Sequence, residues 1–175
     1  VNEDTFETLL EKAAGETVPA EEYARFCEDL RVGKSLVYLT DNCGEIVLDK
    51  MFIRYIKEAY PHLQITVIVR GEEVLNDATM KDAAEVGLTK LVPCMGNGSC
   101  APGTILPRLN DEASERIRTA DVVISKGQGN FESLLGEGVN PYYMFLCKCE
   151  LFVRRFGLNQ FASVFVREER MKLTL

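Results

Sequence analysis

Short, uninterrupted runs of apolar residues, separated by amphipathic helical segments, most constrain the fold of this 175-residue chain. Because each run is continuous rather than alternating, it is typical of a strand covered on both faces. The runs are Leu36–Leu39, Ile65–Val69, Leu91–Met95, Val122–Ser125, Tyr142–Cys147 and Ser163–Val166. The helical segments predicted between them are residues 44–60, 79–86, 110–120 and 149–156. This order predicts an α/β fold, with a parallel, Rossmann-like sheet and helices on both faces.

The N-terminal part of the chain has a different pattern. Amphipathic helices are predicted at residues 4–14 and 20–31, and the alternation of strands and helices begins near Gly33. We therefore expect a short N-terminal helical segment over residues 1–33 and an α/β domain over residues 34–175. The chain is long enough for one sizeable core, whereas a second full domain would be hard to fit.

The charge balance and the distribution of apolar residues argue against several kinds of partner. There are 27 acidic and 20 basic residues, and the net charge of -7 would repel nucleic-acid phosphates and anionic membranes. No stretch approaches the ~20 apolar residues of a membrane span, and the N-terminus lacks the layout of a signal peptide. We expect a cytoplasmic protein that binds neither nucleic acid nor membrane. The sequence leaves homo-oligomerisation open.

The six cysteines are expected to be thiols rather than disulfides, because the chain forms a large core and has no secretory signal. Neither close pair, Cys94 with Cys100 nor Cys147 with Cys149, has the two-residue spacing typical of a tetrahedral zinc site. His62 is the single histidine of the sequence. Metal chemistry based on several imidazoles is therefore excluded.

Carboxylate and amide side chains follow the first two predicted strands. In an open parallel sheet, ligands bind beyond the carboxyl ends of the strands, where the loops converge and helices begin. Asp41 and Asn42 come directly after the first strand, and Asp77 follows the second. Hard cations such as Mg²⁺ and Mn²⁺ take oxygen ligands of these kinds. The three residues therefore predict a divalent-metal site.

Helix capping is the alternative role for these residues, because Asp and Asn are preferred N-caps. Asp41 and Asn42 are adjacent, and two adjacent caps would be redundant, which favours the metal role. For Asp77, Thr79 is the better cap, and Asp82 three residues later would complete a capping box. That arrangement would leave Asp77 available for the site.

Two acidic residues of the first predicted helix also admit two roles. Glu45 and Asp49 lie four residues apart, which places them on one helical face near the N-terminus. Negative charge is favourable there in any case. For Asp49, a solvated helix face is as well supported as a place in the site.

The segment Ser125–Asn130 has the composition of a phosphate site. Lys126 is followed by two glycines, whose small size lets backbone N–H groups approach an oxyanion. The segment is neither a Walker A loop nor a dinucleotide-binding motif, so by itself it is a weak signal. Lys148 ends another apolar run. A place in the phosphate site is one possible role for it; the alternative is a lysine that lays its stem on apolar surface and extends its charge to solvent.

Four separated segments extend this reading: LTDNCGEIVLDK, VIVRGEEVLNDAT, ADVVISKGQGNFESL and FLCKCE. In this order and spacing they closely resemble the DUF89 family of metal-dependent damage-control phosphatases. The resemblance runs from about Lys34 to the C-terminus. It implies hydrolysis of small phosphorylated metabolites, such as sugar phosphates, with Mg²⁺ or Mn²⁺ and with Co²⁺ and Ni²⁺ as further candidates.

The resemblance also implies roles for individual residues. Asp41, Asn42 and Asp77 would hold the metal and would act in catalysis together with Lys126. The residues it implies at the substrate are Glu45, Lys126, Gln128, Asn130 and Lys148. The cation would neutralise phosphoryl charge and orient an attacking water, so that no histidine is required. The sequence lacks the DxD arrangement of haloacid dehalogenase phosphatases, which favours direct attack by water over a phosphorylated Asp41.

Two other functions stay open on the sequence. A carboxyl methyltransferase that uses S-adenosylmethionine is one, since that activity is assigned to a eukaryotic branch of the family that the chain resembles. A Gly-rich loop would then be expected after the first strand, whereas residues 41–45 carry one glycine. A non-catalytic metabolite-binding module would need the polar cluster but no metal. Metal-dependent turnover would distinguish the phosphatase from this module.

Overall fold

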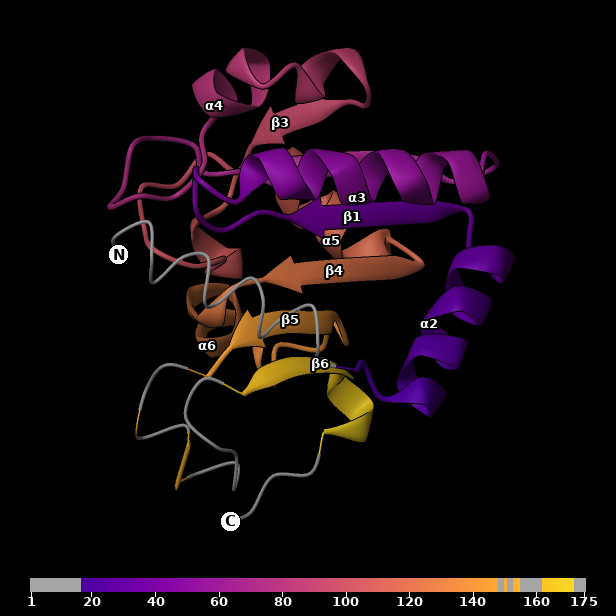
Figure 1. The fold of residues 1–175 in the computed structure, drawn as a ribbon. Helices are drawn as coiled ribbons and strands as arrows, with labels where there is room; N and C mark the ends of the chain where they lie inside the picture. The colour runs from indigo at the N-terminus through magenta and orange to yellow at the C-terminus, as the bar shows by residue number, and fades with distance from the viewer. Residues whose placement is uncertain (1–16, 148–149, 151–152, 155–161, 172–175) are drawn as a thin grey trace, which may run out of the picture.

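The computed structural model describes residues 17–147, 150, 153–154 and 162–171. They form a six-stranded sheet with helices on both faces (Figure 1), in the order β3-β2-β1-β4-β5-β6. The strands are β1 (Ser35–Leu39), β2 (Gln64–Val69), β3 (Cys94–Gly96), β4 (Val122–Lys126), β5 (Tyr142–Leu146) and β6 (Ser163–Arg167). The first five strands are parallel. The predicted α/β class is confirmed, and the strand order is that of a doubly wound Rossmann fold.

The helices divide between the two faces of the sheet. They are α2 (Ala20–Val32), α3 (Ile46–Ala59), α4 (Met80–Glu85), α5 (Asp111–Thr119) and α6 (Gln128–Leu134), with short 3₁₀ turns at Leu88–Lys90, Leu106–Arg108 and Glu168–Arg170. One buried cluster joins α2, α3 and α4 to the sheet, and a second joins α5 and α6 to the opposite face. Along β1, Leu36 and Tyr38 belong to the first cluster, and Val37 and Leu39 to the second. This alternation explains why the strand sequences are apolar throughout.

Two features of the sheet differ from the sequence-based prediction. β6 pairs antiparallel with β5, with Val166 opposite Tyr143, whereas the apolar runs predict parallel strands throughout. An apolar run carries no information on strand direction, so this difference could not be read from composition. The third strand begins at Cys94 rather than Leu91, because a 3₁₀ turn at Leu88–Lys90 and its C-cap occupy the start of the run. A buried turn and a buried strand look alike in hydrophobicity.

The helices largely follow their predicted segments, with one addition. Residues 20–31 and 44–60 form α2 and α3 with small changes at their ends. α6 is the addition: no helix is predicted there from the sequence, and the first residues of α6 belong to the glycine-rich segment that has the composition of a phosphate site. The predicted helix at 4–14 lies outside the described residues, as does most of the one at 149–156.

Helix α2 packs directly against the sheet. The Phe26 ring lies 4.9 Å from the Tyr142 ring and 5.4 Å from the Phe165 ring, measured between centroids. Asp29 Oδ2 accepts hydrogen bonds from the Tyr142 hydroxyl at 2.5 Å and from Arg167 Nη1 at 2.6 Å. α2 therefore shares a core with the strands, although it precedes the domain boundary that the sequence suggests at residue 33.

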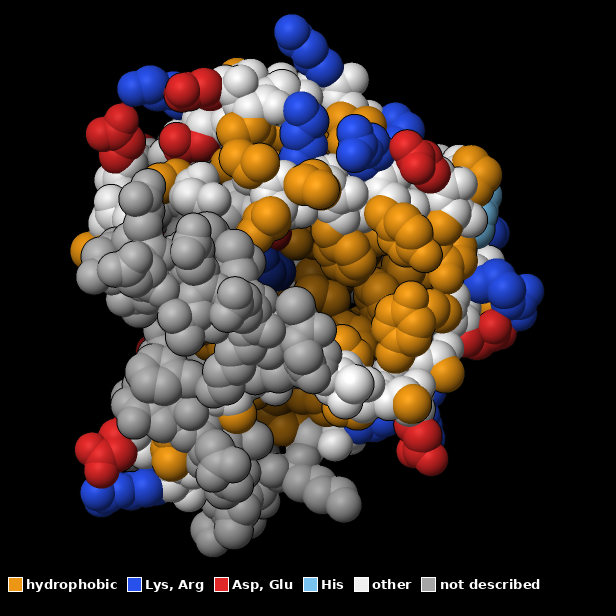
Figure 2. All heavy atoms as spheres, in the orientation of Figure 1, with side chains coloured by type: hydrophobic (Ala, Val, Ile, Leu, Met, Phe, Trp, Pro, Cys, Tyr) orange, Lys and Arg blue, Asp and Glu red, His pale blue; other side chains and the backbone are white. Residues whose placement is uncertain are grey.

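The side of the molecule formed by α2 and α3 exposes many apolar side chains (Figure 2). Tyr23, Val47, Leu48, Met51 and Tyr55 are 47–60% exposed. α3 thus carries apolar residues on its solvent side as well as on the side that faces the sheet. In the described part of the chain, none of the helices has the length and apolarity needed to cross a membrane.

Candidate active site

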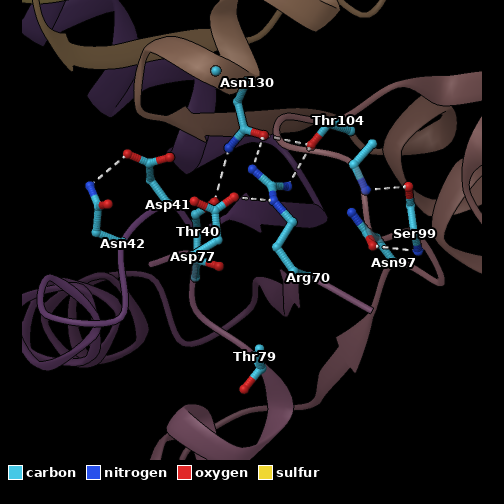
Figure 3. Close-up of polar contacts among 12 residues, drawn as sticks. Thr40, Asp41, Asn42, Arg70, Asp77, Thr79, Asn97, Ser99, Thr104 and Asn130 are labelled. Carbon is cyan, nitrogen blue, oxygen red and sulfur yellow. Dashed lines mark hydrogen bonds and ion pairs between the residues drawn. The ribbon is translucent and has the colours of Figure 1, made fainter. Parts of the chain in front are cut away.

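The loops after β1 and β2 are joined by backbone contacts at the carboxyl edge of the sheet. Asn42 and Asp77 form an isolated antiparallel bridge, and the Ala78 N–H donates to the Asp41 carbonyl at 2.7 Å. Asp41, Asn42 and Asp77 consequently lie close together (Figure 3). The structure thus brings together the three residues predicted as metal ligands.

Helix capping does not account for these side chains. α3 has Glu45 as its N-cap, so the pair at 41–42 lies outside its first turn. α4 is capped by Thr79, whose backbone N–H donates to Asp82 Oδ2 at 2.8 Å in the capping box that the sequence predicts. The aspartate after β2 is therefore not needed as a cap.

The Asp41 carboxylate lies against the backbone of Gly127, between β4 and α6. A Cβ atom at position 127 would overlap the Asp41 carboxylate. Gly127 also has φ +79° and ψ 159°, a conformation that is essentially restricted to glycine. The glycine is therefore required both by space and by backbone conformation. It brings the ends of β1 and β4 together at the point where the strand order reverses.

Asp41 stands in an environment of excess negative charge. Burial, together with the nearby carboxylates of Asp77 and Glu45, raises its pKa from 3.8 to about 6, although Arg70 and Lys126 act in the opposite direction. Within the described residues, the hydrogen-bond donor to the Asp41 carboxylate is the Asn42 amide, at 2.9 Å. Ionised Asp41 is therefore only partly compensated by the protein.

Arg70 is a site residue to which sequence analysis assigns no role. Its side chain is 3% exposed, and its Nε donates to Asp77 Oδ2 at 2.6 Å. Nη2 donates to Asn130 Oδ1 at 2.8 Å, so that the guanidinium joins β2 to α6 (Figure 3). A usable signal exists in the sequence: a charged residue that directly continues a buried apolar strand requires a partner.

Asn130 is a buried connector of several strand ends. Its Nδ2 donates to the carbonyls of Thr40 at 2.9 Å and Lys126 at 2.7 Å, and its Oδ1 accepts from Arg70 and from the Thr104 hydroxyl. The residue is completely buried. All its polar side-chain atoms therefore have protein partners, and the substrate contact predicted for Asn130 stays a prediction.

Lys126 ends β4 with its charge between two carboxylates at the start of α3, those of the N-cap Glu45 and of Asp49. Its Nζ donates to Glu45 Oε2 at 3.0 Å and to Asp49 Oδ1 at 2.8 Å. Burial would lower the pKa of Lys126, but Asp49 and Glu45 outweigh it and raise the pKa above its usual value, which keeps the ammonium charged. Asp49 is 2% exposed, so the solvated-face reading of this residue is wrong.

Residues 1–164 match the family described as "Damage-control phosphatase ARMT1-like domain". The chain belongs to this family. A damage-control phosphatase of Archaeoglobus fulgidus is 34% identical over 161 residues, which are 91% of this chain and 54% of that protein. A damage-control phosphatase of Pyrococcus horikoshii is 29% identical over 171 residues, covering 95% of this chain and 58% of its own length.

A solved structure agrees with this assignment. The crystal structure of a DUF89 family protein from Pyrococcus horikoshii superposes with a TM-score of 0.82 at 27% identity, over 96% of this chain and 59% of that one. The family resemblance and the fold that it implies are therefore confirmed. The chain spans little more than half the length of these relatives.

Two predicted substrate residues, Gln128 and Lys148, have no described contact with this cluster. Gln128 donates from Nε2 to Glu132 Oε1 at 2.8 Å along α6, and Lys148 is outside the described residues. The five cysteines within the described ranges form no disulfide there. No group of three His, Cys, Asp or Glu side chains in those ranges has an arrangement that could hold a metal ion. The candidate ligand set has two carboxylates and the Asn42 amide.

The structure also contains a hollow far from these residues. A cavity of about 510 Å³ lies at the amino-terminal edge of β1 and β2 and is lined by residues such as Lys57, Thr66 and Arg116. In doubly wound sheets the functional edge is the carboxyl edge. The polar cluster at the carboxyl edge is therefore the stronger candidate for the active site.

Proposed function

We propose that this chain hydrolyses small phosphorylated metabolites, sugar phosphates among them, in a reaction that depends on a divalent cation. The convergence of Asp41, Asn42 and Asp77 with Lys126 at the junction of β1 and β4 carries this proposal. The site thus combines oxygen ligands for a hard cation with a fixed positive charge for a phosphoryl group. The names of the two archaeal relatives support the same reaction class.

The charges of the cluster fit a bound divalent cation. Four carboxylates, those of Asp41, Glu45, Asp49 and Asp77, face two cationic side chains, Arg70 and Lys126, which leaves two negative charges in excess. Arg70 engages Asp77, and Lys126 engages Glu45 and Asp49, so the least compensated carboxylate is that of Asp41. Mg²⁺ or Mn²⁺ suits oxygen ligands of this kind.

A cation held by Asp41, Asn42 and Asp77 would supply charge neutralisation and activation of water. Protein side chains would bind the phosphoryl group and orient the water. Lys126, held protonated, would donate to a phosphoryl oxygen. Glu45 has a side chain that is 41% exposed and lies at the rim, where its carboxylate could orient a water molecule. The cytoplasmic location, and the lack of nucleic-acid and membrane partners, stay predictions from the net charge and from the lack of membrane-span and signal-peptide patterns in the sequence.

A phosphatase screen tests the proposal. Sugar phosphates and nucleotides are offered with Mg²⁺, Mn²⁺, Co²⁺ or Ni²⁺ in turn, and released phosphate is measured. We expect release only with metal, and its loss in Asp41→Asn. Asp121→Asn is the matched control, because Asp121 binds the backbone of Lys34 and Ser35 at the opposite edge of the sheet.

Other outcomes would contradict the proposal. Absence of phosphate release with every metal, combined with transfer of a labelled methyl group from S-adenosylmethionine, would favour the methyltransferase. Metabolite binding that needs no metal and leads to no turnover would favour a binding module.

A further inference from the structure

Three side chains form a polar chain from the core to the candidate site. The Tyr38 hydroxyl donates to Asp49 Oδ1 at 2.6 Å, and Lys126 Nζ donates to the same oxygen at 2.8 Å. Tyr38 lies one residue before the end of β1, Asp49 in the first turn of α3 and Lys126 at the end of β4. These hydrogen bonds therefore connect the lysine to two elements that are packed in the core.

The burial of these hydrogen-bonded side chains is unusual for an arrangement that only stabilises the fold. Tyr38 is 1% and Asp49 2% exposed. The second oxygen of Asp49, Oδ2, is buried and has no hydrogen-bond partner among the described residues. A buried carboxylate that is incompletely hydrogen-bonded costs free energy, and apolar residues of similar volume are often at least as stable. A role at the site explains why such a group would stand here.

The two carboxylates that contact Lys126 differ in burial, and Glu45 Oε1 also accepts a hydrogen bond from Asn42 Nδ2 at 3.2 Å. The Glu45 side chain is 41% exposed, whereas that of Asp49 is 2% exposed and is fixed by Tyr38. A lysine side chain is long and flexible, so its position depends on its partners. Its ammonium has three N–H donors. Two of them are used by Glu45 and Asp49, which leaves one for a ligand. The Lys126 side chain is 17% exposed, so a ligand could reach it.

We propose that Asp49, itself held by Tyr38, is a positioning residue that fixes Lys126 for contact with the phosphoryl group. The proposal rests on the proposed function, because it assigns Lys126 to the phosphate. Asp49 does not touch the substrate in this arrangement. It acts by holding the lysine at the edge of the site rather than letting it follow the exposed Glu45.

The test compares two variants with two matched controls. Tyr38→Phe removes only the hydroxyl, and Asp49→Asn removes the charge while keeping the size of the side chain. Tyr142→Phe and Asp29→Asn make the same changes between α2 and the β5–β6 edge, where the Tyr142 hydroxyl and Arg167 likewise donate to one oxygen of Asp29. The affinity for inorganic phosphate is measured by calorimetry with saturating Mn²⁺, and kcat and KM are measured with p-nitrophenyl phosphate.

We expect Asp49→Asn to weaken phosphate binding and to lower kcat/KM by at least about tenfold, since small misplacements of a binding group can cost up to about a hundredfold. Tyr38→Phe should act in the same direction with a smaller effect. Tyr38→Phe should leave Mn²⁺ affinity within about twofold of wild type, because it changes no charge and Tyr38 is not a proposed ligand. In a Lys126→Gln background, Asp49→Asn should have no further effect.

Three results would overturn this inference: phosphate affinity unchanged in Asp49→Asn and Tyr38→Phe, an equal loss in the two controls, or a full effect of Asp49→Asn in the Lys126→Gln background. Failure of the proposed function gives a different pattern. A wild-type protein that binds phosphate through Lys126 but hydrolyses no ester would contradict the phosphatase and leave the positioning role intact. A wild-type protein that binds no phosphate would overturn the positioning role as well.

Discussion

Asp41 and Asp77 are neighbouring carboxylates with opposite environments. Asp77 pairs with the buried Arg70 guanidinium, whereas Asp41 has a pKa raised to about 6 by burial and by nearby carboxylates. Because the folded-state pKa of Asp41 exceeds its value of 3.8 in the unfolded chain, ionised Asp41 destabilises the metal-free protein above about pH 6. The same substitution should therefore have opposite effects at the two positions.

We expect Asp41→Asn to raise the free energy of unfolding of the metal-free protein at pH 7.5 by about 2 kcal/mol, after allowance for partial exposure. Asp77→Asn should lower it by about 3 kcal/mol, because it leaves Arg70 buried without its counter-charge. Both variants should lose the proposed phosphatase activity. Urea denaturation with a chelator present measures the two values. A shift of the same sign in both variants would refute this assignment of the charges.

Gly127 gives a second prediction at the residue scale. Gly127→Ala combines a disfavoured backbone conformation with a steric overlap between the new methyl group and the Asp41 carboxylate. Gly136 is the matched control, since it has φ +82° but no atom within 4 Å of the place that a Cβ would take. We expect Gly136→Ala to cost about 1–2 kcal/mol of stability. Gly127→Ala should cost more and should also displace Asp41, so that Mn²⁺ binding, measured by calorimetry, is lost. Equal stability and retained Mn²⁺ binding would contradict the contact.

Much of this cluster could be predicted from residue types at strand ends. Asp41 and Asn42 come soon after the first strand that the apolar runs reveal, Asp77 lies in the loop after the second, and parallel strands end at one edge. The partners of Arg70 and the burial of Asp49 could not be predicted in this way. Asp49 faces Lys126, which is 77 residues away in the sequence. Such contacts depend on how α3 is placed over the sheet, and helical periodicity alone does not give that placement.

At the scale of elements, α6 connects the ends of three strands through Asn130. Asn130→Ala would leave the Thr40 and Lys126 carbonyls without this donor and would remove an acceptor from the buried Arg70. We expect a loss of about 3 kcal/mol in the free energy of unfolding, because several buried groups lose their partner at once. Asn110→Ala, which removes the N-cap of α5, is the control, with an expected loss of about 1 kcal/mol.

Denaturant unfolding of the two variants measures this difference. A loss at position 130 no larger than that at position 110 would mean that α6 is held mainly by the apolar contacts of Phe131 and Leu134. The existence of α6 itself was not predictable, because glycine lowers helix propensity and glycine-rich segments favour loops. The direction of β6 and the start of β3 were missed for a related reason: hydrophobicity reports burial rather than geometry.

At the scale of the whole molecule, metal binding and pH should be linked through Asp41. The cation requires an ionised carboxylate, and a pKa of about 6 means that most Asp41 is protonated at pH 5. We expect Mn²⁺ affinity to fall about tenfold between pH 7.5 and pH 5 on this account. The stability of the metal-free protein should change in the opposite direction. It should rise as the pH falls from about 6 towards 4, because protonation of Asp41 then favours folding.

Melting temperatures with and without Mn²⁺ at pH 7.5, 6 and 5 measure this linkage. The increase caused by Mn²⁺ should shrink as the pH falls, following the affinity. Asp41→Asn should show little increase at any of the three pH values. A wild-type increase that does not change with pH would show that proton binding at Asp41 and metal binding are independent.

From the order of strands in the sheet we expect the two halves of the proposed site to form at different times during folding. β1 pairs with β2 across a short sequence separation, with Leu36 opposite Ile65. Its pairing with β4 spans a longer separation, with Leu36 opposite Val122. Closing the longer loop costs more chain entropy, so non-local pairings of this kind form slowly. Asp41, Asn42 and Asp77 can therefore assemble once β1 and β2 have paired, and Lys126 joins them only when β4 docks. We expect a nascent chain to bring the three proposed cation ligands together before Lys126, the lysine proposed to bind phosphate, joins them.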